Sequence, residues 1–481
     1  MTKGMGTIKL DDTIVAVSTP IGEGGIGIVR LSGKDALGIA DRIFLSKDGE
    51  TPSRFKTYTV HYGHIVENAQ CPPQKLAGPP MAEIIDEVIL TVMRAPRSYT
   101  KEDVVEINCH SGIVPLKKIL DLVMRNEARL AEPGEFTKRA FLNGRIDILQ
   151  AESVLDIIRA KTDLSLKAAV NNLGGLFSKK IDNIRNELVG ILAHIEATID
   201  FSEEDDVDTL RKKDIFKKLA KIKKEIEKLI STADEGKVLR QGIKAVICGS
   251  PNVGKSSLMN VLLNEPRAIV THIPGTTRDT IEEVVNIKGI PVILVDTAGI
   301  SSTNHPAEKE GVERSHSSIK RADLVIFLLD YGRKMNRHDL KIIQNIKDKN
   351  NTIIVINKND LRKNIDIGLV RKFFPKRPIV YVSALNLQGI DKLENKIRDM
   401  IFKGRAPSPD FISISNDRQL GKLRSSLDDI KTAVDSLRER VSMDCVSICV
   451  RSSIESLGEI IGDTVTEEAL DKIFSEFCIG K

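Results

Sequence analysis

Eight residues from Gly249 to Ser256, GSPNVGKS, have the spacing of a phosphate-binding loop, G-x-x-x-x-G-K-[ST]. The glycines let the backbone curl so that its N–H groups face the phosphates of a nucleoside triphosphate. Lys255 can reach the β- and γ-phosphates, and the Ser256 hydroxyl can bind Mg²⁺. The flanking residues predict a buried strand over 243–248 and a helix over 257–263, whose N-terminus would face the phosphates. The motif therefore predicts a triphosphate with Mg²⁺ rather than a chance glycine turn.

A second motif, Asn357 to Asp360 (NKND), selects the base. It ends a predicted buried strand over 352–356, where an α/β sheet presents its ligand contacts. The Asp360 carboxylate can accept from guanine N1–H and the 2-amino group together, whereas adenine would leave this carboxylate unpaired. Lys358 would lie along the base plane, and Ser383 to Leu385 resembles a further guanine-contacting loop. These residues predict GTP.

Two more elements lie between these motifs. Thr277, in the segment GTTRD, has the position of a switch I threonine that binds Mg²⁺. Asp296 to Gly299 (DTAG) supplies a Walker B aspartate and a glycine amide for the γ-phosphate. The order of all these elements along the chain is that of a GTP-binding domain.

The residues also indicate how hydrolysis is catalysed. Ile300 stands where Ras-like enzymes place a water-orienting glutamine, so another device is needed. The Asn252 amide oxygen can coordinate a monovalent cation, with oxygens from Thr271 to Thr276 on the same ion, and a K⁺ there would act as an arginine finger does. Ordinary turn chemistry explains Asn252 equally well from its spacing alone. For the group that orients water we expect Glu308, although Glu310 or Glu313 would suit by composition.

The elements that must position these residues fall into blocks. Residues 12–110 predict mainly short strands, 149–162, 164–199 and 213–234 predict helices, 243–403 alternate strand and helix, and 416–440 and 444–477 predict helices again. The simplest architecture is a helical domain interrupted by an inserted α/β domain with a mainly parallel sheet. Cys445 and Cys449 are four apart on one predicted helix, and we expect them to pack in the core rather than to bind metal.

Composition sets limits on the class of protein. In 481 residues, 29% are charged and 41% hydrophobic, which predicts a soluble globular chain. No apolar run approaches a membrane span of ~20 residues. The N-terminus lacks a signal-peptide core, and six scattered cysteines favour a reducing cytoplasm. A net charge of +5 permits a nucleic-acid partner without requiring one.

The chain resembles the TrmE/Era group of potassium-activated GTPases and, over essentially its whole length, the MnmE (TrmE) family of tRNA-modifying GTPases. The resemblance rests on segments outside the α/β domain: DTIVA (12–16), GGIGIVR (24–30), SYT with ED (98–103), PGEFTKRAFLNG (133–144) and FCIGK (477–481). It implies an N-terminal α+β folate-binding and dimerisation domain (1–145), two segments of one helical domain (146–241 and 405–481) and a Ras-like G domain (242–404).

The resemblance also implies roles for individual residues. It places K⁺ on Asn252, Thr271, Ile273 and Thr276, Mg²⁺ on Ser256 and Thr277, and the water-orienting carboxylate on Glu308 when two G domains dimerise. The GTP site then comprises the P-loop neighbours of Asn252, the switch segments and the guanine loops: Val253, Gly254, Lys255, Ser256 and Ser257; Thr271, His272, Ile273, Pro274, Gly275, Thr276 and Thr277; Asp296, Thr297, Ala298 and Gly299; Asn357, Lys358, Asn359, Asp360, Ser383 and Ala384.

In the N-terminal domain the resemblance implies that Arg30, Glu106 and Arg145 hold a formyl-tetrahydrofolate-type cofactor, a chemistry that suits two cations and a carboxylate. Arg145 replaces an expected lysine, and Lys101 and Ser111 replace expected glycines. The segment 22–27 matches G-x-G-x-x-G, but a dinucleotide fingerprint opens a helix and residues 26–31 predict a strand, so we expect no NAD or FAD here.

The implied activity is GTP hydrolysis that serves tRNA modification. With its FAD-containing partner MnmG, in a heterotetramer, the family modifies C5 of the wobble uridine to a carboxymethylaminomethyl or aminomethyl group. The family implies a role for Cys478 in that reaction, whereas a lone cysteine near a chain end is by itself most often an inert thiol. The alternative is an Era- or Der-like regulatory GTPase of ribosome assembly, which would carry a KH-like module with a G-x-x-G loop after the G domain. The helical tail here disfavours that alternative.

Overall fold

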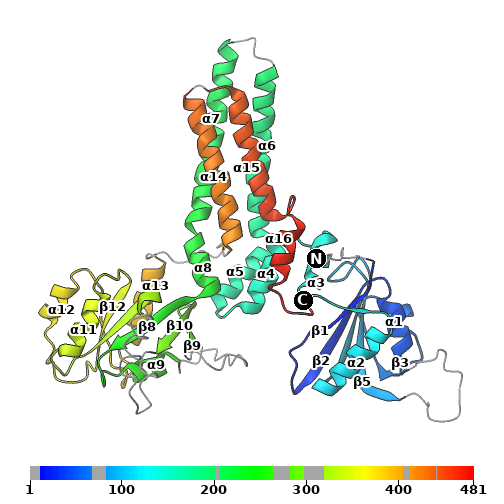
Figure 1. The fold of residues 1–481 in the computed structure, drawn as a ribbon, viewed down its shortest axis with the longest axis horizontal. Coiled ribbons are helices and arrows are strands. Elements are labelled where there is room, and N and C mark those ends of the chain that lie inside the picture. Colours follow the sequence, from blue (N-terminus) through cyan, green and yellow to red (C-terminus); the bar gives the residue numbers. More distant parts are fainter. Residues whose placement is uncertain are drawn as a thin grey trace, which may run out of the picture. The chain divides into compact units, whose positions relative to one another are not determined.

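The computed structural model describes residues 11–67, 83–200, 205–263, 282–296, 319–402, 404, 412, 414, 416–439 and 441–481. The chain forms two compact units (Figure 1). The first comprises residues 1–155 with 461–481, and the second comprises residues 156–460. Among the described residues, no helix is both long and apolar enough to cross a membrane.

The first unit is built on a seven-stranded sheet in the order β3-β4-β5-β6-β2-β1-β7. Its strands pair antiparallel except β1 and β7, which are parallel. Two amphipathic helices, α1 (Ala36–Ile43) and α2 (Ile113–Arg125), bury Ile39, Ile43, Ile119 and Val123 against one face of the sheet. The strands are β1 (Ile14–Val17), β2 (Gly24–Ser32), β3 (Phe44–Ser46), β4 (Thr59–Val66), β5 (Ile84–Met93), β6 (Val104–Ser111) and β7 (Arg129–Leu130), and a 3-10 turn spans Pro52–Arg54.

The end of the chain packs within this same unit. Helices α3 (Glu135–Leu142), α4 (Ile148–Arg159) and α16 (Glu467–Phe474) share a buried cluster that includes Ala140, Ile148, Leu155, Leu470 and Phe474. Because residues 461–481 fold with residues 1–155, the C-terminal segment becomes part of the N-terminal unit.

In the second unit four long helices stand side by side: α6 (Leu176–Asp200), α7 (Asp205–Ser231), α14 (Asp417–Arg438) and α15 (Met443–Ile461) (Figure 1). The single helix predicted over 164–199 is wrong, because α5 (Asp163–Leu173) ends at Gly174 and Gly175 adopts a left-handed φ of 80°. The helix predicted over 213–234 likewise divides at Thr232 into α7 and α8 (Ala233–Gln241). Cys445 is exposed and Cys449 is only partly buried, so the expectation that both cysteines of α15 pack in the core is wrong.

The α/β part of the second unit is a six-stranded sheet in the order β13-β12-β11-β8-β10-β9. All neighbouring pairs are parallel except β9 and β10, so the expected mainly parallel sheet is confirmed. Every residue of β11 and β12 is buried, as strands covered on both faces require. The strands are β8 (Ile243–Gly249), β9 (Glu282–Ile287), β10 (Ile290–Asp296), β11 (Leu324–Asp330), β12 (Thr352–Asn357) and β13 (Ile379–Tyr381).

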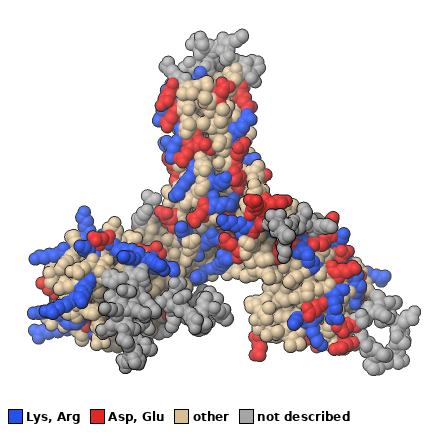
Figure 2. All heavy atoms as spheres, viewed as in Figure 1, with Lys and Arg blue, Asp and Glu red and all other residues tan. Residues whose placement is uncertain are grey.

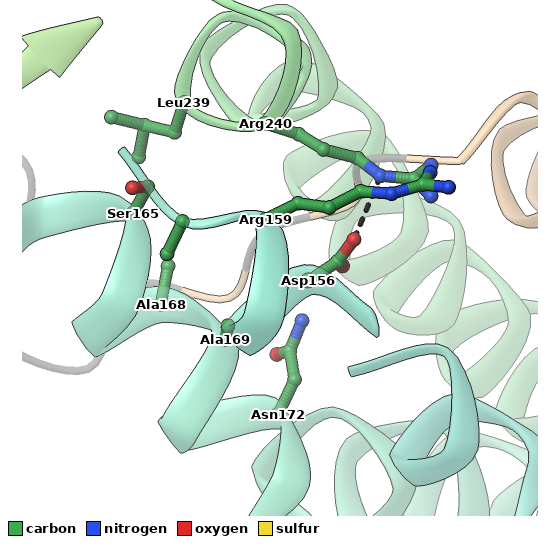
Figure 3. Close-up of a pocket in the computed structure, with 9 residues that line it drawn as sticks. Asp156, Arg159, Ser165, Ala168, Ala169, Asn172, Leu239 and Arg240 are labelled. Atoms are coloured by element: carbon green, nitrogen blue, oxygen red, sulfur yellow. Dashed lines mark ion pairs between the residues drawn. The ribbon is translucent and has the colours of Figure 1, made fainter. Parts of the chain in front are cut away.

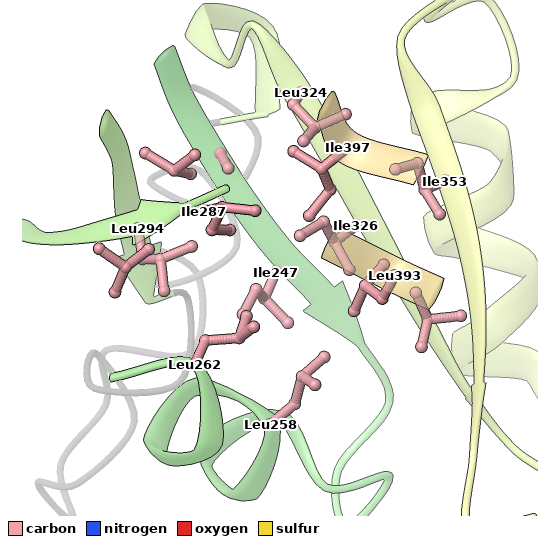
Figure 4. Packing of buried hydrophobic residues seen from close by; sticks show 14 of the residues in the cluster. Ile247, Leu258, Leu262, Ile287, Leu294, Leu324, Ile326, Ile353, Leu393 and Ile397 are labelled. Carbon is pink, nitrogen blue, oxygen red and sulfur yellow. The ribbon is translucent and has the colours of Figure 1, made fainter. Parts of the chain in front are cut away.

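Helices cover both faces of this sheet. On one face α9 (Lys255–Leu263) and α13 (Ile390–Ile401) contribute Leu258, Leu262, Leu393 and Ile397 to a cluster with the strands (Figure 4). On the other face α11 (Arg337–Ile346) and α12 (Ile367–Phe373) bury their apolar residues against β11 and β12. The carboxyl ends of β8, β11 and β12 lie together, because Leu328 pairs with Gly249 and Asp330 pairs with Asn357. In such sheets this edge is where ligands bind.

Candidate functional site

The predicted phosphate-binding loop joins β8 to α9, as its sequence requires. Asn252 and Gly254 have left-handed φ angles of 63° and 95°. A Cβ on Gly249 would stand 2.5 Å from the Leu328 carbonyl oxygen, and one on Gly254 would stand 2.3 Å from Asn357 Nδ2. Both glycines are therefore required by close approach of the neighbouring strands.

Lys255 is held inside this loop. Its Nζ donates to the carbonyl oxygens of Gly249 and Ser250, each at 3.1 Å. Lys255 also begins α9, and Ser256 and Ser257 lie in the first turn of that helix. A helix N-terminus presents unpaired N–H groups and a partial positive charge, so cation, hydroxyls and backbone donors meet at one place that suits phosphate.

Two of the residues predicted to select guanine are hydrogen-bonded directly to the phosphate-binding loop. Asn357 donates from Nδ2 to the Val253 carbonyl oxygen at 2.9 Å and accepts the Ala384 N–H at 3.0 Å. Lys358 Nζ donates to the Asn252 carbonyl oxygen at 2.8 Å. Three segments far apart in the sequence are thereby joined into one cradle.

Within that cradle Asp360 is exposed and accepts the Ser383 hydroxyl at 2.5 Å. Ser383 in turn accepts the Asn386 N–H at 3.2 Å. Asn359 Oδ1 is buried, and no group of the described residues donates to it. The Lys358 ammonium is also 2.8 Å from the Asp330 carboxylate at the end of β11. The structure thus brings together Asn252, Lys358, Asp360 and Ser383, which the sequence predicted to be neighbours in one site.

Sequence reasoning missed a support behind the loop. Ser250 is fully buried and donates from its hydroxyl to Asp339 at 2.5 Å. Arg333 donates to both oxygens of Asp339, at 2.9 and 3.2 Å, and Asn336 and Asp339 form the capping box that starts α11. The sequence signal was available as the N-x-x-D spacing before an apolar helix, but it does not reveal the hydrogen bond with Ser250.

The other predicted GTP-site and metal residues lie outside the described residues. These are 271–277, 297–299, Ile300 and Glu308; Asp296 ends β10, and its side chain is likewise not described. Ser256 and Asn252 are therefore the described members of the proposed Mg²⁺ and K⁺ ligand sets.

The three predicted folate residues all lie in the first unit. Arg30 Nε donates to Glu106 at 2.7 Å, and the two side chains are 17% and 19% exposed, so this pair is reachable from solvent. The Arg30 guanidinium lies 5.7 Å from the Phe136 ring centre, and the Arg145 guanidinium lies 4.7 Å from that of Tyr99. Phe136 belongs to the buried cluster against which Tyr99 packs, so both arginines lie against side chains of the same cluster region.

The chain end lies against the same residues. Arg30 Nη1 donates to the Gly480 carbonyl oxygen at 3.4 Å, and the Ser18 hydroxyl donates to it at 3.2 Å. Gly480 has a φ of 93°, and a Cβ there would stand 2.4 Å from the Val17 carbonyl oxygen. Cys478 is exposed, and its carbonyl oxygen accepts the Gly134 N–H at 3.3 Å. The terminal segment is thus placed beside Arg30, a proximity that the sequence could not show.

A buried ionic network holds the segment 133–144 to this region. Arg139 is fully buried and forms ion pairs with Asp12 at 2.5 Å, Glu135 at 3.0 Å and Glu102 at 3.1 Å. Glu102 also accepts the Ser32 hydroxyl at 2.6 Å. Residues of the segments 12–16, 98–103 and 133–144, on which the family resemblance rests, therefore hold one another in position.

The replacements at expected glycines fit the backbone. Lys101 adopts a left-handed φ of 60°, which explains a glycine preference there, and its Nζ donates to the Gly144 carbonyl oxygen at 3.0 Å. The Ser111 hydroxyl donates to the Gly22 carbonyl oxygen at 2.9 Å. The G-x-G-x-x-G segment continues into strand β2 and opens no helix, so the rejection of a dinucleotide fingerprint stands on the observed strand.

A separate pocket lies among α4, α5 and α8 (Figure 3). Arg240 Nε is 2.7 Å from Asp156 within it, and Arg159, Ser165 and Asn172 complete its polar lining. Its free space is about 20 Å³, which admits about one water and no nucleotide or folate.

Comparison with known proteins shows relatives for both units of the chain. A model of the GTP-binding protein TrmE N-terminus matches residues 13–145, and a model of the MnmE helical domain matches residues 148–478. The tRNA modification GTPase MnmE of Bacillus licheniformis is 46% identical over 98% of this chain and 100% of its own length. That of Desulforamulus reducens is 48% identical over the same shares. The solved G domain of the T. maritima FeoB iron transporter is 27% identical and matches 33% of this chain and 97% of its own, with a TM-score of 0.26. The chain belongs to the MnmE family of tRNA modification GTPases.

Proposed function

We propose that this GTPase uses GTP hydrolysis to serve modification of the wobble uridine of certain tRNAs at C5, to a carboxymethylaminomethyl or aminomethyl group. The observation that carries the proposal is the cradle formed by Asn252, Lys255, Asn357, Lys358 and Asp360, in a chain related to tRNA modification GTPases over 98% of its length. GTP and Mg²⁺ are the ligands of such a GTPase. The ribosome-assembly alternative loses its support, because the matched relatives are tRNA modification GTPases along their whole length.

For the metal ions we propose Ser256 and Thr277 as Mg²⁺ ligands and Asn252, Thr271, Ile273 and Thr276 as K⁺ ligands. The left-handed φ of Asn252 supports this assignment, because it makes the backbone turn within the loop that would surround the phosphates. K⁺ would supply positive charge between the β- and γ-phosphates, where charge develops during hydrolysis. We assign the orientation of water to Glu308 across a dimer of G domains.

For the folate we propose Arg30, Glu106 and Arg145. Arg30 uses its Nε–H on one carboxylate oxygen of Glu106, which leaves the other oxygen to accept from the donor edge of a pterin. Arg145, stacked on Tyr99, can pair with the anionic glutamate tail. When bound, a formyl-tetrahydrofolate-type cofactor would provide the one-carbon unit. Cys478 is assigned a role in the reaction on the grounds of its exposure and of its place in the segment that contacts Arg30.

We further infer that the protein works in the cytoplasm with MnmG, which would contribute FAD, in a heterotetramer. It would form a homodimer through its N-terminal domain and a transient one through its G domains. We retain the limits 1–145, 146–241, 242–404 and 405–481 as the proposed functional domains.

The deciding experiment is nucleoside analysis of tRNA from cells that lack this protein. We expect loss of the C5-modified wobble uridine and its restoration by the parent gene but not by an Asp360→Asn variant. An unchanged wobble profile would remove the modification role and leave only the GTPase.

A further inference from the structure

Positive charge is concentrated in one short part of the chain. Residues 331–377 contain 13 Lys and Arg against 4 Asp and Glu, a formal net charge of +9, whereas the whole chain carries +5. The remaining 434 residues therefore carry a net charge of −4. Figure 2 shows these blue side chains gathered over the part of the second unit that carries α11 and α12.

The fold places this charge on one surface. Helices α11 and α12 cover the same face of the six-stranded sheet, where Ile343, Ile346, Val370 and Phe374 share one buried cluster. The opposite sides of these helices, with the loop 361–364 between them, point to solvent. We call this surface the α11–α12 face and define it by six exposed residues: Arg337, Lys341, Arg362, Lys363, Arg371 and Lys372.

Among the residues that the structure describes, carboxylates do not neutralise these six cations. Within the described part of the chain, none of the six forms an ion pair, and Arg371 only donates to the Arg377 carbonyl oxygen at 2.9 Å. Of the four acidic residues in 331–377, Asp339 is buried and paired with Arg333, and Asp366 caps α12. By contrast, Lys180, Lys221 and Lys288 elsewhere in this unit all have carboxylate partners.

The chemistry of the face suits a phosphate backbone. Lysine is depleted at the centres of protein–protein interfaces, whereas both Lys and Arg bind nucleic-acid phosphates without demanding close shape complementarity. Several unpaired cations on one surface release counterions when they meet a polyanion, which provides affinity that depends on salt. This favours RNA over a protein as the occupant.

We propose that the α11–α12 face binds the phosphate backbone of tRNA. The proposal rests on the proposed function, in which tRNA is the substrate, and adds where on the G domain that substrate is held. Helix α11 carries Arg337 and Lys341 of this face and also the buried Asp339, which accepts the Ser250 hydroxyl of the phosphate-binding loop, so one helix contributes to both sites.

The test is a full-length variant with Arg337→Glu, Lys341→Glu, Lys363→Glu and Lys372→Glu, compared with a matched control in which Lys213, Lys218, Lys224 and Lys228 of α7 are changed to Glu. Fluorescence anisotropy with an unmodified tRNA transcript would be read over a range of salt. We expect the Kd to rise by about tenfold or more in the first variant only. The slope of log K against log salt should fall by roughly one for each phosphate that the variant no longer neutralises. Equal weakening of binding in both variants, or unchanged binding in both, would overturn the proposal.

A second measurement needs no substitution. Acetylation of Lys341, Lys363 and Lys372 in the parent protein, read by mass spectrometry, should be suppressed by tRNA, whereas acetylation of Lys224 and Lys228 should not change. Lysine acetylation that is the same with and without tRNA would count against the proposal, even if the charge-reversed variant of the α11–α12 face failed to fold. If the charge-reversed variant bound tRNA normally but no longer formed a complex with a protein partner, the face would instead be assigned to an acidic protein. Nucleoside analysis of the deletion strain is independent of these readouts, so failure of the function and failure of the face are distinguishable.

Discussion

In the proposed site, Asp360 would select the base through a pattern of donors and acceptors rather than through shape. Its carboxylate is exposed and is oriented by the Ser383 hydroxyl at 2.5 Å, so one oxygen is engaged while guanine donors can reach the other. An amide in its place would present a donor to guanine N1–H, and two donors would face each other.

We therefore expect Asp360→Asn to weaken GTP binding by roughly 100-fold and to favour xanthosine triphosphate, whose base offers an acceptor at that edge. Competition binding with a fluorescent nucleotide measures both effects. The matched control is Asp348→Asn, an exposed acid just beyond the end of α11. Retained preference for GTP would show that base recognition does not depend on this carboxylate.

The Glu135 carboxylate links stability of the first unit to pH. Burial alone would raise its pKa, but hydrogen bonds from Arg129, the Glu132 N–H and Arg139 hold the pKa of Glu135 below its ordinary value. A depressed pKa in the folded state gives stability that is complete above the ordinary value of 4.5 and is lost as the pH falls through the lower, folded-state pKa.

We expect Glu135→Gln to lower the free energy of unfolding at neutral pH by about 3 kcal/mol, because the fully buried Arg139 loses a charged partner. The difference from the parent should shrink as the pH falls below 4.5 and through the lower, folded-state pKa, because Glu135 itself then becomes protonated. Calorimetry across this range, with hydrogen exchange of α3 to identify the transition, measures both quantities. Glu132→Gln, at an exposed neighbour, should change neither, and a pH-independent loss in Glu135→Gln would contradict the linkage.

At the scale of elements, α11 supports the phosphate-binding loop from behind. Ser250, Asp339 and Arg333 form a chain of hydrogen bonds from the loop to the start of that helix. Ser250→Ala should leave the buried Asp339 without one donor, at a cost of about 1 kcal/mol and roughly a fivefold rise in the Kd for GTP.

Stopped-flow binding of a fluorescent GTP analogue tests this support. Asp339→Asn removes charge from the whole chain of bonds, so we expect a larger rise in Kd than for Ser250→Ala. Asp348→Asn again provides the exposed control. Unchanged binding in both variants would show that the loop keeps its shape without α11.

Local patterns predicted most elements but not their breaks. The buried runs at 243–248 and 352–356 became β8 and β12, because continuous apolar residues suit strands covered on both faces. The predicted helix over 164–199 broke at Gly175, whose left-handed conformation outweighed the helical periodicity on either side. Cys445 shares its helical spacing with Cys449, yet only the packing of α15 decides that Cys445 is exposed.

At the scale of the whole molecule, the compact units do not follow the order of the sequence, because residues 461–481 fold with residues 1–155. Motif spacing could predict the guanine and phosphate loops, because each motif is local and the order of strands fixes where they meet. It could not predict that Gly480 accepts a hydrogen bond from Arg30, 450 positions earlier. Such hydrogen bonds between distant segments depend on the whole fold, which local periodicity does not contain.

The GTPase cycle should depend on K⁺. Ile300 stands where Ras-like enzymes place a water-orienting glutamine, so this chain needs another catalytic device. A K⁺ beside the phosphates would supply positive charge where charge develops during hydrolysis. We therefore expect GTP turnover at least about tenfold faster in K⁺ than in Na⁺ at equal ionic strength. Asn252→Gly should abolish this difference while sparing nucleotide binding, because glycine keeps the left-handed φ of 63° and removes only the side-chain oxygen. Phosphate release assays in the two salts measure the effect. Equal rates in the parent would remove K⁺ from the mechanism, and K⁺ stimulation that survives Asn252→Gly would place the ion on other oxygens.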